Sequence, residues 1–151
     1  MAATKSYIFL DPGPLARQVV IWLYVHLATG LFFGLANAVT LTELSRLDPT
    51  SPAAGELASD LLLLATAVLY LLAFVFSGFL ILKWTYRVNR NAHAFASGLS
   101  NSPPWSVGWY FIPFASLWKP YQALSEAWRA SESPERWRSG KTPSLFPWWW
   151  G

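Results

Sequence analysis

Three basic residues and two tryptophans are the side chains in this sequence with the clearest binding chemistry. Arg87 and Arg90 follow the second of two apolar stretches, while Trp105 and Trp118 bound an aromatic run that Lys119 follows. Basic side chains bind anionic groups, and indole rings settle at the headgroup level of a bilayer. Two interpretations stay open. The bases anchor the membrane topology and bind carbonyls freed by nearby prolines, or the five residues hold an anionic lipid headgroup or ligand.

Residues for catalysis or metal binding do not form a recognisable group. The sequence has no cysteine, and its two histidines, His26 and His93, are far apart along the chain. It contains neither a G-x-S-x-G motif nor a glycine-rich phosphate loop. A zinc site needs three or four ligands, and no His, Asp and Glu residues cluster at such spacing. We therefore expect no catalytic residue, no metal and no cofactor, and we do not expect an enzyme.

Each apolar stretch carries a stripe of small and polar residues. At about 100° per residue, the members of a stripe share one side of a helix. Small residues let a second helix approach closely, and polar residues avoid lipid. The stripes are His26, Gly30, Gly34 and Asn37 in the first stretch and Thr66, Tyr70, Ala73 and Ser77 in the second. We predict that they face each other in an antiparallel hairpin; a proton or ligand path along the first stripe is the functional alternative.

The composition of the chain and the lack of charge in the two apolar stretches indicate membrane-spanning helices. Hydrophobic residues make up 54% of the 151 residues and charged residues 13%, whereas an average soluble domain is roughly 25% charged. No Asp, Glu, Lys or Arg occurs in residues 18–42 or 61–82. At about 1.5 Å per residue, each stretch exceeds the roughly 30 Å hydrocarbon core of a bilayer. The sequence predicts a membrane-spanning helix in each range; a cleaved signal peptide is the alternative for the first.

The third apolar segment, 103–118, is too short to span and contains Pro113, so we expect a re-entrant or interfacial element, with a third span as the alternative. The other segments follow from charge and turn signals. They are a leader (1–16), an outer loop (43–60), a helical extension that stops at Gly98 (83–98), an amphipathic helix (120–131) and the expected start of a further membrane helix (145–151).

The distribution of Lys and Arg predicts the orientation. The loop 43–60 holds four acids and one base, whereas bases without nearby acids follow the second span, and five more lie in 119–141. Cytoplasmic loops carry the excess of Lys and Arg, so the N-terminus and residues 83–98 should be cytoplasmic. Because the bases lie where topology puts them, we expect no nucleic-acid partner. The expected partners are the lipid bilayer and a second copy or another membrane protein.

Three motifs in the second half resemble a bacterial membrane family known only as a domain of unknown function, forty-three twenty-eight. They are R-x-N-x-N-A (87–92), S-P-x-W-x-V-G-W-x-x-x-P (102–113), and L-W-K-P-x-Q (117–122) followed by W-x-A-S (128–131). The chain departs from the family at Ser116, where members often have Asn, and at its end, where members usually continue into further membrane helices. The resemblance implies a multi-pass membrane protein and no activity.

Together these patterns predict an all-α fold, an integral membrane helical bundle of two spans with a short aromatic element and an amphipathic helix. The expected function is that of a non-enzymatic assembly component or a ligand- or lipid-binding membrane component. The expected location is a bacterial plasma or inner membrane. A small transporter or channel component and a lipid-handling enzyme are the alternatives.

Overall fold

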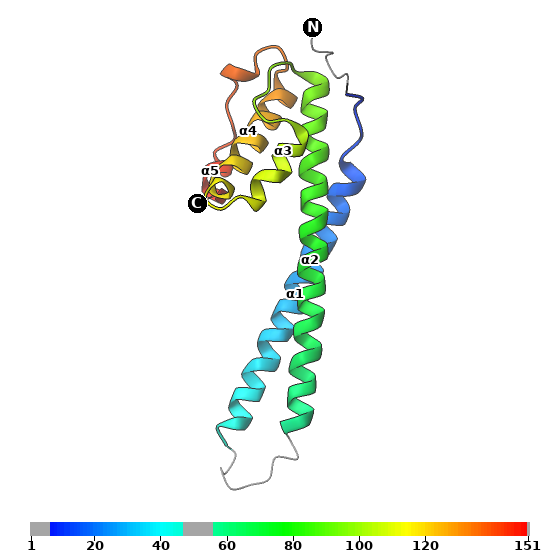
Figure 1. The fold of residues 1–151 in the computed structure, drawn as a ribbon, viewed down its shortest axis with the longest axis vertical. Helices are drawn as coiled ribbons and strands as arrows, with labels where there is room; N and C mark the ends of the chain where they lie inside the picture. Colours follow the sequence, from blue (N-terminus) through cyan, green and yellow to red (C-terminus); the bar gives the residue numbers. More distant parts are fainter. Residues whose placement is uncertain (1–6, 47–55, 151) are drawn as a thin grey trace. The chain divides into compact units, whose positions relative to one another are not determined.

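The computed structural model describes residues 7–46 and 56–150, and every regular element in these residues is a helix (Figure 1). The all-α fold class is thereby confirmed. Much of the expected outer loop, residues 47–55, lies outside the described residues. The helices are α1 (Gly13–Leu44), α2 (Glu56–Phe95), α3 (Pro103–Gly108), α4 (Lys119–Glu132) and α5 (Leu145–Trp150), with 3₁₀ turns η1 (Trp109–Phe111), η2 (Ala115–Leu117) and η3 (Trp137–Ser139).

The chain forms two compact units. The hairpin unit comprises residues 17–80, and the terminal unit comprises residues 1–16 together with 81–151. Both α1 and α2 contribute residues to each unit. The apolar parts of α1 and α2 are long enough to cross a membrane, over Gly13–Glu43 and Ser59–Phe95.

In the hairpin unit, aromatic contacts join α1 and α2 as antiparallel neighbours. The ring centroids of Trp22 and Phe76 are 4.3 Å apart, and His26 stacks on Tyr70 at 5.0 Å. Phe33, two turns further along α1, also stacks on Tyr70 at 5.7 Å. The less exposed residues of both helices recur at alternating spacings of four and three. This series comprises Trp22, His26, Thr29, Phe33, Ala36 and Thr40 in α1 and Leu63, Thr66, Tyr70, Ala73, Ser77 and Leu80 in α2. Four further less exposed residues each directly follow a member of the series: Gly30, Asn37, Ala67 and Gly78.

That spacing averages 3.5 residues, the repeat that keeps one seam facing a partner helix in left-handed packing. Gly30 lies beside this seam, since a Cβ there would come 3.3 Å from the Tyr70 ring. Gly34 does not: no atom lies within 4 Å of the position its Cβ would take. Successive steps of four residues drift about 40° each around a helix, so the predicted stripe leaves the contact at Gly34.

Most of the buried core residues of the terminal unit are alanines. Its buried core contains Ala92 and Ala96 of α2, Ala127 and Ala130 of α4, and Trp137 of η3. Small side chains let the helices approach closely, and the Trp137 indole N–H donates to the Ser97 carbonyl at 3.1 Å. Helix α2 ends at Phe95, and the chain turns at Gly98, whose φ is +72°.

Residues 103–118 fold into short pieces rather than one helix. Helix α3 has six residues, or about 9 Å, and the turns η1 and η2 have three each. Pro113, which has no backbone N–H, separates η1 from η2. None of these pieces is long enough to cross a membrane.

Candidate functional site

The structure divides the predicted basic and aromatic group into two settings. Arg87 donates to the Asp11 carbonyl at 3.3 Å, and the Arg90 guanidinium lies 5.9 Å from the Tyr7 ring centroid. Lys119 instead lies 5.4 Å from the Trp109 ring. Both arginines therefore contact the N-terminal segment, residues 7–12, and the lysine contacts the aromatic segment.

The two predicted tryptophans also differ in their surroundings. The ring centroids of Trp105 and Trp109 are 4.7 Å apart. Trp105 therefore packs on the same indole ring that Lys119 contacts. Trp118 precedes α4 and is exposed. No hydrogen bond or ring contact in the described part of the chain joins the lysine and the tryptophans to either arginine.

Polar members of the two predicted stripes bond within their own helices. Asn37 donates to the Phe33 carbonyl at 2.8 Å, and the Thr66 and Ser77 hydroxyls donate to carbonyls three residues earlier. Ala73 is buried beside them. These bonds satisfy three of the polar side chains locally, which suits helix packing more than a relay of protons from side chain to side chain. The buried Nδ1 of His26 has no hydrogen-bond partner in the described residues.

The N-terminal segment is held against α2 by one amide side chain. Asn91 accepts a hydrogen bond from the Leu10 N–H at 3.0 Å and donates to the Leu10 carbonyl at 2.6 Å. Phe9 packs on Phe95 with ring centroids 5.4 Å apart, and Tyr7 packs on His93. The segment therefore runs along the last turns of α2 and adds its own side chains to that surface.

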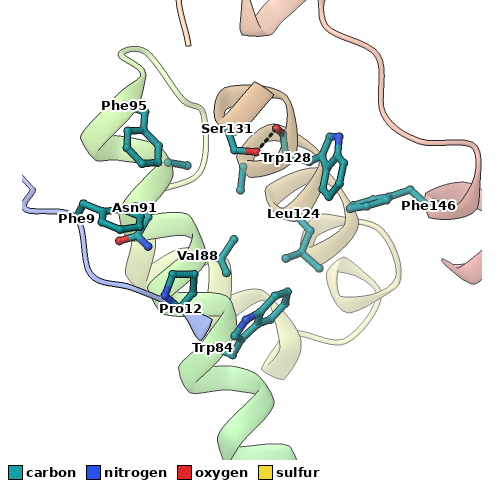
Figure 2. A pocket seen from close by; sticks show the side chains of 12 residues that line it. Phe9, Pro12, Trp84, Val88, Asn91, Phe95, Leu124, Trp128, Ser131 and Phe146 are labelled. Carbon is teal, nitrogen blue, oxygen red and sulfur yellow. Dashed lines mark hydrogen bonds between the residues drawn. The ribbon is translucent and has the colours of Figure 1, made fainter. Parts of the chain in front are cut away.

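These elements enclose a groove with a volume of about 380 Å³, called here the apolar groove (Figure 2). Figure 2 shows Val88 of α2 opposite Leu124 of α4, with Phe146 beside Trp128. Small-molecule sites span roughly 300–1,000 Å³ and are mostly apolar, so this groove has the size and character of a ligand site. Its lining residues are Phe9, Pro12, Trp84, Val88, Asn91, Ala92, Phe95, Leu124, Ala127, Trp128, Ser131 and Phe146.

A buried polar network, which the sequence analysis did not identify, holds α4 to the turn after α2. Glu126 is 7% exposed and accepts hydrogen bonds from the N–H groups of Ser100 and Asn101, from the Ser100 hydroxyl and from the Asn101 amide. Asn101 in turn accepts from the Trp109 indole at 3.1 Å, and its carbonyl lies 2.8 Å from the His93 Nε2.

The signal for this network is present in the sequence. Glu126 falls at helical spacing with Ala123, Ala127 and Ala130, which are all buried. A carboxylate on the alanine face of a helix must be buried, and a buried carboxylate needs hydrogen-bond donors. Both carboxylate oxygens of Glu126 accept such hydrogen bonds, and these bonds indicate a structural role for this side chain.

Two further buried polar residues lie on α2. Asn89 is 1% exposed, and neither polar atom of its side chain has a partner in the described residues. Thr85 is also 1% exposed. Burial raises the pKa of Tyr110, and the nearby Thr85 hydroxyl lowers it by a smaller amount. Asn89 and Asn91 therefore have separate surroundings, although they belong to one motif.

Comparison with known proteins identifies a family. A family model described as Domain of unknown function (DUF4328) matches residues 48–151, which is more than half of the chain. The match includes α2, α3, α4 and α5, and so most of the residues that line the apolar groove. No curated protein and no solved structure matches the chain.

Proposed function

The chain belongs to this family, Domain of unknown function (DUF4328), and from that premise we propose that it is a non-enzymatic membrane protein that binds the acyl chain of a lipid in the apolar groove. In this proposal it is a multi-pass protein of a bacterial plasma or inner membrane, and its N-terminus is cytoplasmic. The observation that carries the proposal is the groove itself, because its lining is apolar and is formed in part by the last turns of α2, a helix long and apolar enough to cross a membrane.

The hairpin unit supports the membrane location. Large apolar side chains along both helices are exposed, among them Leu31 and Leu35 of α1 and Leu64 and Leu71 of α2. An apolar surface of this extent is unfavourable in water. It marks a region that contacts a membrane or another protein. Lipid tails would cover it around the whole hairpin.

Charge supports the orientation. The terminal unit contains nine Lys and Arg residues and four Asp and Glu residues. The hairpin unit contains two Lys and Arg residues and four Asp and Glu residues. An excess of Lys and Arg is typical of the cytoplasmic side. In the proposed orientation the terminal unit, with the apolar groove, lies at the cytoplasmic face.

Arg87 lies next to residues of α2 that line the groove, where it would favour an anionic headgroup. It is three residues after Trp84 and four before Asn91, so all three are neighbours on α2. Its only hydrogen bond in the described residues is the 3.3 Å bond to Asp11, and no carboxylate lies within ion-pair distance of it there. An unpaired guanidinium beside an apolar groove suits a lipid whose headgroup is negative.

The experiment is photo-crosslinking in proteoliposomes with lipids that carry a diazirine in the acyl chain. Phosphatidylglycerol and phosphatidylcholine versions test the headgroup. We expect crosslinks at Trp84, Leu124 and Trp128, with phosphatidylglycerol giving the higher yield. Val88→Trp should fill the groove and reduce these crosslinks several-fold.

The matched control is Val75→Trp, which adds the same ring at an exposed position of α2. It should leave the groove crosslinks unchanged. Crosslinks confined to α1 and α2, with none on α4, would show that the groove is not a lipid site. Thermal unfolding of both variants in detergent checks that they retain the fold.

A further inference from the structure

The terminal unit has an unusual distribution of side chains for a surface in water. Its interior holds small and polar residues, including Ser106, Asn101 and Glu126, which are all buried. Large apolar residues lie on its outside instead. Four of them, called here the exposed aromatic patch, come from one short stretch: Phe111, Phe114, Leu117 and Trp118.

The backbone presents this patch by means of a strained turn. Phe114 has φ +65° and ψ −52°, and the Ala115 N–H donates to the Pro113 carbonyl at 2.8 Å. These values and this bond define a γ-turn of the rare, strained form. Such a backbone costs roughly 1–3 kcal/mol, and conformations of this kind cluster at functional sites. Here the strain holds a phenyl ring that is 78% exposed.

Helix α5 adds apolar side chains beside the patch. The Trp150 indole N–H donates to the Leu117 carbonyl, which joins α5 to η2. Leu145 and Trp148, three residues apart on α5, are exposed, and Trp148 is 86% exposed. Two separate segments of the terminal unit therefore expose aromatic and leucine side chains.

We propose that the exposed aromatic patch, with Trp148, inserts into the interfacial layer of the membrane that the hairpin unit spans. This inference rests on the membrane location in the proposed function but not on the apolar groove. Trp favours the headgroup level, and Trp, Phe and Leu form the apolar faces of segments that lie in the interface. Lys119 directly follows the patch. The uncharged stretch of α2 ends at residue 82, and Lys83, Arg87 and Arg90 of the terminal unit follow it, as expected for side chains close to lipid headgroups.

Charge favours lipid over a second copy as the occupant. The terminal unit carries five more bases than acids, so two such units repel each other. An anionic leaflet attracts the same charge, at about 1 kcal/mol for each basic residue close to its surface. Insertion would remove the exposed rings from water and attract the surrounding bases to phosphate.

The test uses single cysteines with spin labels, which is straightforward because the natural chain has no cysteine. Phe111→Cys, Leu117→Cys and Trp148→Cys are labelled in proteoliposomes that contain phosphatidylglycerol. Collision with oxygen reports lipid exposure, and collision with a water-soluble nickel chelate reports water exposure. We expect all three labels to show high oxygen accessibility and nickel accessibility several-fold below that of Glu135→Cys, an exposed position in the polar loop.

Leu71→Cys, exposed on the apolar part of α2, is the lipid reference. Nickel accessibility at position 71 equal to that at 135 would overturn the membrane location itself. A lipid-exposed label at 71 together with water-exposed labels at 117 and 148 would overturn only the insertion of the patch. Low accessibility of 117 and 148 to both reagents, with spin–spin broadening, would mean that a second copy covers the patch, and would also overturn the inference.

Discussion

Replacing Glu126 by glutamine should loosen the turn that follows α2. The carboxylate accepts bonds from the N–H groups of Ser100 at 3.2 Å and Asn101 at 3.3 Å, and from the Asn101 amide at 3.2 Å. Glutamine has nearly the same shape, so it removes the negative charge without opening a cavity. The Ser100 hydroxyl can rotate to accept from the new amide, so the main loss is at the three N–H donors.

The size of this loss follows from those three bonds. A hydrogen bond to a charged group contributes about 1.5–3 kcal/mol, and one between neutral groups about 0.5–1.5 kcal/mol. The difference is about 1 kcal/mol for each donor. Because the donors share one carboxylate and their contributions are not additive, we expect about 2–3 kcal/mol in total. An opening equilibrium of the turn would then shift by roughly 30- to 150-fold.

Hydrogen–deuterium exchange of residues 96–102 measures that opening, because the Ser100 and Asn101 amides are themselves donors to Glu126. Their exchange should accelerate in Glu126→Gln by the factor given above. Glu132→Gln is the matched control, since Glu132 lies on the same helix and is exposed. Equal exchange rates in the two variants would refute the argument that the carboxylate charge stabilises the turn.

Three other substitutions test the contact between α1 and α2 and the contact of the N-terminal segment with α2. Gly30→Leu should lower stability by about 1–3 kcal/mol, because the new side chain would crowd Tyr70, whereas Gly34→Leu faces open space and should be nearly silent. Thermal unfolding in detergent compares them, and similar losses would contradict the seam described above. Asn91→Leu removes both bonds to Leu10, so exchange of the Leu10 amide should rise markedly while α4 stays protected. An unchanged rate at Leu10 would show that other contacts hold the N-terminal segment.

The long helices were predictable because their causes are local. An uncharged stretch must be helical to cross lipid, and nothing between Lys83 and Phe95 breaks the helix before the chain turns at Gly98. Helix α4 runs over Lys119–Glu132, against the expected range 120–131, since Pro120 can only occupy the first turn of a helix. Periodicity and proline position are sufficient for such assignments.

The stripe on α1 was predicted only in part for a geometric reason. The α2 stripe alternated steps of four and three, and Thr66, Ala73 and Ser77 are buried. The α1 stripe used two steps of four through Gly30 and Gly34, so it followed the glycines rather than the packing repeat. A spacing of 3.5 residues, applied to both helices, would have selected Phe33 instead of Gly34.

The contacts of the candidate site were not predictable from spacing. Asn91 and Leu10 are 81 residues apart, and Glu126 and Asn101 are 25 apart. Such pairs depend on how the N-terminal segment and α4 return to α2, which no local pattern encodes. For the same reason Arg87 and Lys119, which look alike in the sequence, contact different parts of the terminal unit.

The way Asn91 holds the N-terminal segment has a consequence for which sequences that segment can carry. A carboxamide has the same donor and acceptor as a peptide group, and Asn91 pairs with both main-chain groups of Leu10 as a neighbouring strand would. The contact therefore recognises the peptide group and not the leucine side chain, which is itself exposed. Most residues can replace Leu10 without loss of this anchor, and proline, which has no N–H to donate, is the exception.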